Sequence, residues 1–347
     1  MTIKYVSLFS GAGGLDEGLH RAGFTPLFCC EIDKYARESL ANWAIARNIS
    51  PKIWDDINTL DPANLLSQIR MKKGELPLLV GGPPCQSFSL IGKRRSLEDA
   101  RGLLFYKMLE FADVLRPQVV LIEQVKGLRS AKGADGSAGG ALRFMLSELE
   151  ALGYNVEWQI LRASNYGIPQ HRDRLFIVAT NCGKFSFPQQ THFSIAEVEK
   201  GSLFNDLKPH VTLADVILDL PPPVRKGEIE EIPGHVDVTP QRDMERINGV
   251  PQGECLAKQL HLPESQRMRL NPSKDTTKFR RLAFELPSLT LRCGEAFYHP
   301  IENRYLTPRE YMRIHTFSDD QTLAGPIRAR TGTVKNLDQH RQVANAV

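Results

Sequence analysis

The sequence lacks the features that would make it a metal-stapled, exported or membrane protein. Its six cysteines include no C-x-x-C pair, which argues against the common zinc sites and against a disulfide framework. No run of about 18 apolar residues occurs, so no membrane-spanning helix is expected. The start, Met1 to Lys4, lacks the basic-then-apolar pattern of a secretory signal. We therefore expect a soluble, cytoplasmic protein without a metal site.

Charge of one sign is also scarce. The formal net charge is only +4, which permits a polyanionic partner without demanding one. The small excess is uneven, with 22 basic and 19 acidic residues in residues 1–181 but 13 and 14 in residues 182–280. We expect attraction of phosphates to fall on the first region.

What is present is ordinary globular composition in 347 residues, enough for about two domains. Short, uninterrupted apolar runs alternate with helical patterns throughout residues 1–181. This alternation predicts a doubly wound α/β domain with a mostly parallel, Rossmann-like sheet. The expected strands are 5–9, 27–30, 78–80, 119–122, 156–161 and 175–180. One expected helix follows the first strand and ends at His20, and the others span 34–47, 103–115 and 141–152.

Regularity is lost in residues 182–280, where only Leu213 to Leu220 has a clear helical pattern. We interpret this stretch as a smaller, irregular domain. Residues 281–347 return to regular structure with a helix from Pro308 to about Thr316. Thr307 can cap that helix and Glu310 can close a capping box.

Chemistry-bearing residues follow the apolar runs, where an open α/β sheet binds its ligands. The first run leads into the glycine turn Phe9 to Gly14, the second into Glu31, and a later segment into Asp56 and Ile57. A carboxylate at Glu31 suits the hydroxyls of a ribose. Asp16 stands where a dinucleotide motif has its third glycine and would repel a pyrophosphate, which favours S-adenosylmethionine (AdoMet) over NAD.

The run ending at Val80 leads into Gly82-Pro83-Pro84-Cys85-Gln86. Two prolines before a thiol present Cys85 rigidly at the sheet edge, as a nucleophile requires, although most cysteines are buried and inert. Glu123 ends the next run and suits a proton donor, the alternative being a capping or surface carboxylate. Gln170, Arg172 and Arg174 alternate and predict one polar row, the alternative being a solvated edge strand.

Taken in order, these blocks resemble the C5-cytosine-specific DNA methyltransferase family of restriction-modification systems. The matching segments are the turn from Phe9, the Pro-Cys motif, Asp99 to Phe105, Glu123-Gln124-Val125, the Gln-x-Arg-x-Arg row and Leu306 to Arg313. The resemblance spans the chain apart from about residues 182–280, which occupy the place of the family's target-recognition domain. Residues 1–181 and 281–347 then correspond to the catalytic domain.

The resemblance implies a reaction at a cytosine flipped out of duplex DNA, with AdoMet as the methyl donor. The catalytic residues would be Cys85, which adds to C6, Glu123 at N3, Arg174 by the base carbonyl and Arg172 in support. The implied cofactor-binding residues are Phe9, Gly11, Ala12, Gly13, Glu31, Ile32, Asp56, Ile57, Gly82, Pro84, Leu104, Asn345 and Ala346. The implied DNA contacts are Gln86, Ser89, Lys93, Arg94, Arg95, Gln170 and Thr290.

Two positions depart from the family pattern. Gln124 replaces an asparagine, and its extra methylene displaces the amide by about 1.5 Å; we expect activity to persist. The family's Gln-x-Gly-Asn block ends this chain as Gln342 to Val347 with Ala344 for glycine. A helix follows this block in relatives, so we expect a chain truncated at its C-terminus.

The resemblance further implies a monomer acting on the chromosome of a prokaryotic cell, with a cognate restriction endonuclease that cuts the same site. A tRNA cytosine-C5 methyltransferase and a catalytically impaired DNA-binding homologue are the alternatives. The long irregular segment favours duplex DNA over tRNA. A small-molecule methyltransferase is disfavoured because it would need neither the Pro-Cys motif nor that segment.

Overall fold

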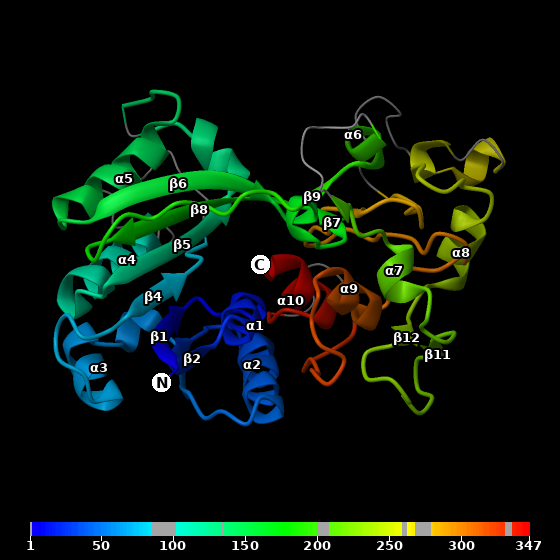
Figure 1. Cartoon of the computed structure of the whole chain (residues 1–347). Coiled ribbons are helices and arrows are strands. Elements are labelled where there is room, and N and C mark those ends of the chain that lie inside the picture. The colour runs from blue at the N-terminus through cyan, green and yellow to red at the C-terminus, as the bar shows by residue number, and fades with distance from the viewer. Residues whose placement is uncertain are drawn as a thin grey trace. The chain divides into compact units, whose positions relative to one another are not determined.

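One sheet of seven strands organises the first half of the chain, in the order β3-β2-β1-β4-β5-β8-β6 (Figure 1). The computed structural model describes residues 2–84, 102–133, 135–199, 208–258, 262–267, 279–329 and 335–347. The strands are β1 (Ile3–Leu8), β2 (Phe24–Cys30), β3 (Lys52–Trp54), β4 (Leu78–Gly81), β5 (Val119–Val125), β6 (Asn155–Arg162) and β8 (Asp173–Thr180). All neighbours pair in parallel except β8, which runs antiparallel to β5 and β6. The predicted doubly wound, mostly parallel sheet is confirmed.

Helices cover both faces of this sheet because strand side chains alternate between the faces. Val6 and Leu8 belong to the large core cluster, to which three helices contribute on one face. Tyr5 packs with the first helix on the other face, and Cys29 packs there with Trp43 of the second. The helices are α3 (Pro62–Ile69), α4 (Gly102–Leu115) and α5 (Gly140–Ala151) on the first face, and α1 (Gly14–Arg21) and α2 (Lys34–Ala46) on the second.

The strand order reverses between β1 and β4. From β1 the chain proceeds outward to β2 and β3, and it then returns to β4 and proceeds in the other direction. Ligands of open α/β sheets bind beyond the carboxyl ends of the strands at such a reversal. The fold therefore directs attention to the residues that follow β1 and β4.

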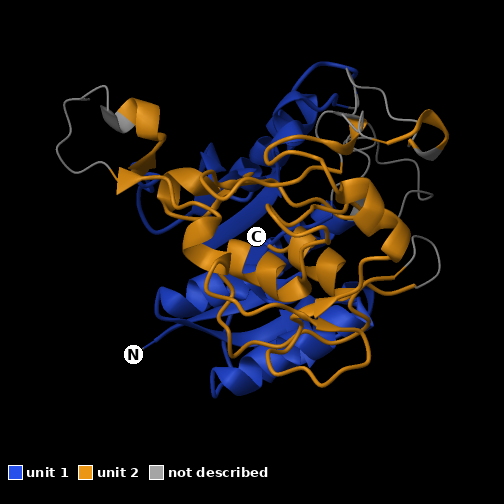
Figure 2. Ribbon diagram, turned by 90° about the vertical axis from the view of Figure 1, so that its right-hand side faces the viewer, with its two compact units in different colours: residues 1–162, 173–189, 347 blue, residues 163–172, 190–346 orange. Residues whose placement is uncertain are grey.

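The chain divides into two compact units, coloured separately in Figure 2. Unit 1 comprises residues 1–162, 173–189 and 347, and unit 2 comprises residues 163–172 and 190–346. Two short 3-10 helices, η1 (Ile57–Thr59) and η3 (Lys126–Ser130), complete unit 1. The bounds differ from those of the predicted domains, because residues 281–346 cluster with unit 2. Which segment recognises the target stays a prediction.

Short elements make up unit 2. They are η4 (Ala163–Tyr166), β7 (Gln170–His171), β9 (His192–Phe193), α6 (Ile195–Glu199), β10 (Lys208–Pro209), α7 (Ala214–Ile217), β11 (Val224–Arg225), β12 (Val236–Asp237), α8 (Gln241–Ile247), η5 (Leu256–Lys258), η6 (Glu264–Gln266), β13 (Ser288–Leu289), α9 (Pro308–Ile314) and α10 (Gln339–Asn345). The capping box of Thr307 and Glu310 is confirmed at the start of α9. The helix expected over 213–220 is shorter, and α8 was not expected because only its Ile247 is buried.

Candidate functional site

A tight turn carries the chain from β1 into α1 at the reversal point. Gly11 and Gly13 adopt positive φ angles of 57° and 84° there. A Cβ on Gly13 would lie 3.1 Å from the Cδ1 atom of Leu40, so a side chain at this position would be both strained and crowded. A Cβ on Gly11 would meet nothing within 4 Å, which leaves open space beside the turn.

Glu31, which follows β2, is held against this turn by two backbone donors. Its Oε2 accepts from the Gly11 N–H and its Oε1 from the Asp33 N–H, each at 2.8 Å. Burial raises the pKa of the Glu31 carboxyl, against the opposing effect of these hydrogen bonds. The Glu31 carboxylate thus already accepts from the Gly11 N–H, which is the backbone donor that a phosphate bound at this turn would need. The turn suits a nucleoside without phosphate, which fits AdoMet and does not fit a dinucleotide.

The other expected cofactor residues of unit 1 differ in exposure. Ile32 is 71% exposed and offers an apolar surface beside Glu31, whereas Ile57 is only 5% exposed and belongs to the core. Asp56 caps η1 by accepting from the backbone and side-chain nitrogens of Asn58, each at 2.9 Å. Leu104 and Phe9 are partly buried against the same core cluster. Their contacts with a cofactor stay predictions.

The segment that follows β4 is anchored to β5 by Gln124. The Nε2 of this buried side chain donates to the Pro83 carbonyl at 2.7 Å. Gly82 approaches the same strand so closely that a Cβ there would lie 3.1 Å from the Oε2 of Glu123. The two backbone positions before Pro84 are therefore fixed against β5.

Glu123 and Arg174 form a largely buried ion pair at this edge. Arg174 Nε lies 2.7 Å from Glu123 Oε1, and the two side chains are 17% and 11% exposed. Since Val125 pairs in register with Arg174, the arginine shares a face of the sheet with Val125 and Glu123. Burial lowers the pKa of Arg174, and Glu123 opposes that effect. The sequence-predicted acid and one of its arginines are thus in direct contact.

Asp173 was not singled out from the sequence, although it supports the same corner. It accepts from Lys126 at 2.7 Å and from Arg162 at 2.8 Å. The hydrogen bond from Arg162, followed by that from Lys126, lowers the pKa of Asp173 to about 2. The alternating charges of His171 to Arg174 were the available signal. The partners of Asp173 are Lys126 and Arg162, which lie 47 and 11 residues away from it in the sequence, so spacing alone did not reveal them.

The polar row expected from Gln170, Arg172 and Arg174 is divided between the units. The Arg172 N–H donates to the Gln170 carbonyl at 2.9 Å, so the backbone turns instead of staying extended. The Arg172 guanidinium is buried in unit 2, where it donates to the carbonyls of Ala344 and Ala346 at 3.0 and 2.7 Å. Its role in supporting the acid stays a prediction.

The remaining expected residues of unit 2 lie in or beside its short strands and its last helix. Gln170 is fully buried with its Nε2 3.3 Å from a ring nitrogen of His315. The Thr290 hydroxyl donates to the His171 carbonyl at 2.6 Å. Asn345 is exposed and Ala346 is buried. None of these placements tests the expected contacts with DNA or cofactor.

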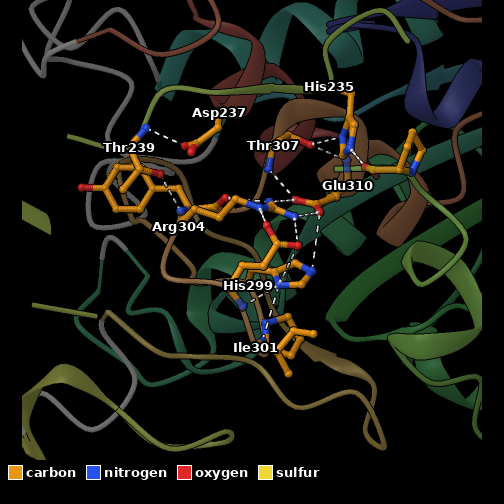
Figure 3. Close-up of polar contacts among 12 residues, drawn as sticks. His235, Asp237, Thr239, His299, Ile301, Arg304, Thr307 and Glu310 are labelled. Atoms are coloured by element: carbon orange, nitrogen blue, oxygen red, sulfur yellow. Dashed lines mark hydrogen bonds and ion pairs between the residues drawn. The ribbon is translucent and has the colours of Figure 1, made fainter. Parts of the chain in front are cut away.

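A buried ion network holds the start of α9 in unit 2 (Figure 3). Arg304 donates to both carboxylate oxygens of Glu310, at 2.8 and 2.7 Å, and Glu310 accepts from the Thr307 N–H. His235 contacts the Thr307 hydroxyl at 3.0 Å. The His299 ring lies 3.9 Å from Glu310, and burial followed by the charge of Arg304 lowers its pKa to about 4. This network is structural and joins segments far apart in the sequence.

The expected nucleophile and several DNA contacts lie outside the described residues: Cys85, Gln86, Ser89, Lys93, Arg94 and Arg95. Within the described ranges, no group of three or more His, Cys, Asp or Glu side chains is arranged to hold a metal ion. Within the same ranges, no helix has the length and apolar character needed to span a membrane.

Comparison with known proteins agrees with these features. The chain is 34% identical to the type II methyltransferase M.PspPI of a Psychrobacter species, over 99% of this chain and 75% of that protein. It is 32% identical to M.Eco47II of Escherichia coli, over the same shares. M.AquIA of a Picosynechococcus species is 37% identical over 64% of this chain and 90% of its own.

Solved structures show the same fold. An E. coli prophage protein described as a DNA modification methyltransferase superposes with a TM-score of 0.67 at 20% identity, covering 100% of this chain and 95% of its own. The Dnmt2 methyltransferase of S. pombe gives 0.55 at 19% identity, with coverages of 99% and 94%. The family model for C-5 cytosine-specific DNA methylases matches residues 3–347. The chain therefore belongs to the C-5 cytosine-specific DNA methylase family.

Proposed function

We propose that this chain transfers a methyl group from AdoMet to C5 of a cytosine in duplex DNA, through a covalent adduct with Cys85. The observation that carries the proposal is the Glu123–Arg174 pair, buried beside the Pro83–Pro84 segment at the carboxyl edge of the sheet. A carboxyl group and a guanidinium at this distance can bind one ring nitrogen and one carbonyl of a cytosine together. Family membership supports the same chemistry.

The cofactor residues would be the turn after β1, Glu31 and Ile32. Glu31 would accept from the ribose hydroxyls, since each of its oxygens retains a lone pair beyond the backbone donor that it already binds. Ile32 would cover the adenine face, and Asp56 would accept from the amino group. AdoMet supplies the methyl group as an electrophile. Asn345 and Ala346 are proposed to contribute from unit 2.

The proposed role of Cys85 is covalent. Its thiolate forms a bond to C6, and Glu123 delivers a proton to N3, so that electron density collects at C5. C5 would then take the methyl group of AdoMet, whose sulfur keeps the electrons of the broken bond and leaves as a neutral thioether. The C5 proton then leaves to solvent, the C6–S bond breaks and the N3 proton returns to Glu123. Each turnover thus regenerates the thiolate and replaces one hydrogen by a methyl group.

Arg174 would change partners during this reaction. In the free chain its guanidinium pairs with the Glu123 carboxylate at 2.7 Å. A cytosine carbonyl that draws Arg174 toward itself would leave the Glu123 carboxylate free to take a proton from solvent and deliver it to N3. Arg172 would support the acid through the backbone of the neighbouring segment.

The DNA would be recognised by residues 182–280 and held by residues 86–101, which follow Cys85. A base whose ring atoms react has to leave the stack, so we propose a flipped cytosine. Lys93, Arg94 and Arg95 would meet phosphates, and Gln86, Ser89, Gln170 and Thr290 would complete the contacts. We propose a monomer in the cytoplasm of a prokaryotic cell, paired with an endonuclease that cuts the same sequence.

Tritiated AdoMet tests the proposal directly. The wild-type chain should label plasmid DNA, whereas Cys85→Ala should abolish labelling. The matched control is Cys182→Ala, because Cys182 is an exposed cysteine on the same unit. Transfer that persists in Cys85→Ala would overturn the covalent mechanism.

The acceptor is tested in parallel. Labelling of tRNA in place of DNA would show the alternative acceptor, and binding of DNA without any label would show an impaired homologue. Bisulfite sequencing of DNA from cells that express the chain would reveal the methylated sequence.

A further inference from the structure

A groove in unit 1 lies outside every residue assigned above to cofactor, cytosine or target recognition. It has a volume of about 760 Å³ and lies between η3, α5 and β6. Leu142, Trp158 and Ile160 form apolar lining, and Lys126, Arg129 and Arg143 supply its charge. In the described part of the chain, no acidic side chain lines it.

The positive charge of the groove is only partly compensated. Lys126 and Arg162 share the single carboxylate of Asp173, which leaves one excess charge. Arg143 donates to neutral oxygens, those of Ser137 at 2.7 Å and Ala138 at 3.0 Å. Ser137 in turn donates to Asp135, an exposed carboxylate outside the groove lining, whose pKa is lowered by the hydrogen bonds from Ser137 and also by the charge of Arg143. Asp135 therefore offsets part of the charge of Arg143.

Arg129 adds a further free charge. It is exposed and makes no ion pair with any residue that the structure describes. A groove with this excess attracts an anion, and three cations spread along it suit a chain of anions better than a single one.

The groove and the Glu123–Arg174 pair approach each other at the carboxyl edge of β5, although they lie on opposite faces of the sheet, since Ile160 pairs with Leu175 and Leu161 pairs with Arg174. Lys126 follows the last residue of β5, three residues after Glu123. Its partner Asp173 precedes Arg174 in β8. The two sites therefore share the carboxyl edge of β5. The Lys126–Asp173 ion pair of the groove is next to the Glu123–Arg174 pair in the sequence.

We propose that this groove binds the sugar–phosphate backbone of DNA that flanks the methylated cytosine. The cations would meet successive phosphates, and Trp158, which is 37% exposed, would pack against deoxyribose. The groove lining combines cations with apolar side chains, which matches the phosphates and the sugars of one strand of that backbone. The excess of basic residues in 1–181 over 182–280 agrees with this placement. The inference rests on the proposed function for its choice of DNA over an acidic protein segment.

The test compares Arg129→Gln/Arg143→Gln with a variant of equal charge, Lys72→Gln/Lys73→Gln. Lys72 and Lys73 are exposed in the turn before β4. They lie at the amino end of that strand, whereas the groove begins after the carboxyl end of β5. Binding of a fluorescent duplex of about 30 base pairs is followed by anisotropy between about 50 and 200 mM salt. Thermal unfolding of each variant checks that the fold is retained.

The groove variant should bind the duplex about tenfold more weakly, and the slope of log K against log salt should fall by about 2, since each lost phosphate contact removes about 0.9. The lysine control should keep the wild-type slope. Arg129→Lys/Arg143→Lys, which keeps the charges, should restore most of the affinity. Equal losses in the two glutamine variants, or tighter binding of a poly-glutamate peptide than of DNA by the wild type, would overturn the proposal.

Measuring methyl transfer as well as DNA binding separates this inference from the proposed function. The groove variant should raise the KM for plasmid DNA and leave kcat and the KM for AdoMet unchanged. A wild-type chain that binds DNA with the expected salt slopes but transfers no methyl group would refute the proposed function and leave the groove assignment intact.

Discussion

Two adjacent residues of β5 perform different tasks because their side chains point to opposite faces of the sheet. Glu123 pairs with Arg174, whereas Gln124 reaches the Pro83 carbonyl. The family pattern has asparagine at position 124, and the extra methylene of glutamine displaces the amide. At 2.7 Å the glutamine donates well, so this departure from the pattern is accommodated in the structure.

Replacing Gln124 by leucine should therefore loosen the segment before Cys85. The change keeps the volume but leaves the Pro83 carbonyl without its donor, at a cost of about 1–3 kcal/mol in the free energy of unfolding. We expect a lower kcat for methyl transfer and an unchanged KM for AdoMet, measured with tritiated cofactor and denaturant unfolding. The control is Gln159→Leu, because Gln159 is exposed on β6. Equal effects of the two substitutions would contradict a positioning role for Gln124.

At the scale of the element, α9 illustrates how a short helix is held in an irregular unit. A capping box closes its first turn, and Arg304 neutralises the buried carboxylate of Glu310. Removal of one partner from a buried pair is expected to destabilise by about 3–5 kcal/mol, because the other charge remains buried. The neutral His299 packs against this pair.

His299 should make the stability of unit 2 depend on pH. Its pKa falls from 6.5 in the unfolded chain to about 4 in the folded chain, so below about pH 6.5 the unfolded state binds the extra proton. Stability should thus decline as the pH falls from about 6.5 to 4, by at most about 1.4 kcal/mol per pH unit from this group. Urea unfolding of the wild type and of His299→Asn across this range measures it. Above pH 7 the difference between the two curves should be constant, because the neutral ring still accepts from the Ile301 and Glu302 N–H groups in the wild type. A difference that stays constant down to pH 4 would refute the assignment.

The sequence predicted the elements whose pattern is long or uninterrupted. The apolar runs of β1, β4 and β5 and the periodicity of α2 were sufficient, and they placed the glycine turn and Glu31 at strand ends. The hydrogen bond between Gly11 and Glu31 was not predicted. The strand β3, with three residues, and the helix α8, with one buried residue, carry too little pattern. The partners of Arg172 could not be predicted because they lie 119 to 174 residues away and are backbone carbonyls, which no sequence motif marks.

At the scale of the whole molecule, the chain passes between the units more than once. Residues 163–172 leave the sheet after β6, contribute β7 to unit 2 and return as β8. Within unit 2, β7 pairs with β13, and Arg172 binds carbonyls at the end of α10. Neither unit is therefore a continuous stretch of sequence.

Arg172→Met should destabilise unit 2 in a specific place. The substitution keeps the buried stem but leaves the carbonyls of Leu291, Ala344 and Ala346 without this donor, at a cost of about 2–4 kcal/mol. Hydrogen exchange should show lost protection in α10 before the rest of the chain. Arg162→Met is the control, since Arg162 is half exposed and its ion pair should contribute less than about 1 kcal/mol. Uniform loss of protection throughout the chain would contradict this prediction.

The excursion of residues 163–172 also sets a rule for module exchange. A chimera spliced at residue 190 would combine the β7 segment of one parent with the β13 strand and α10 helix of the other. Arg172 of one parent would then have to bind the carbonyls at the end of α10 of the other parent. A mismatch there would lie two residues from Arg174, at the proposed catalytic edge. A hybrid that transplants 163–172 together with 190–346 keeps the β7–β13 pairing and the contacts of Arg172 with α10 within one parent, and it should fold better.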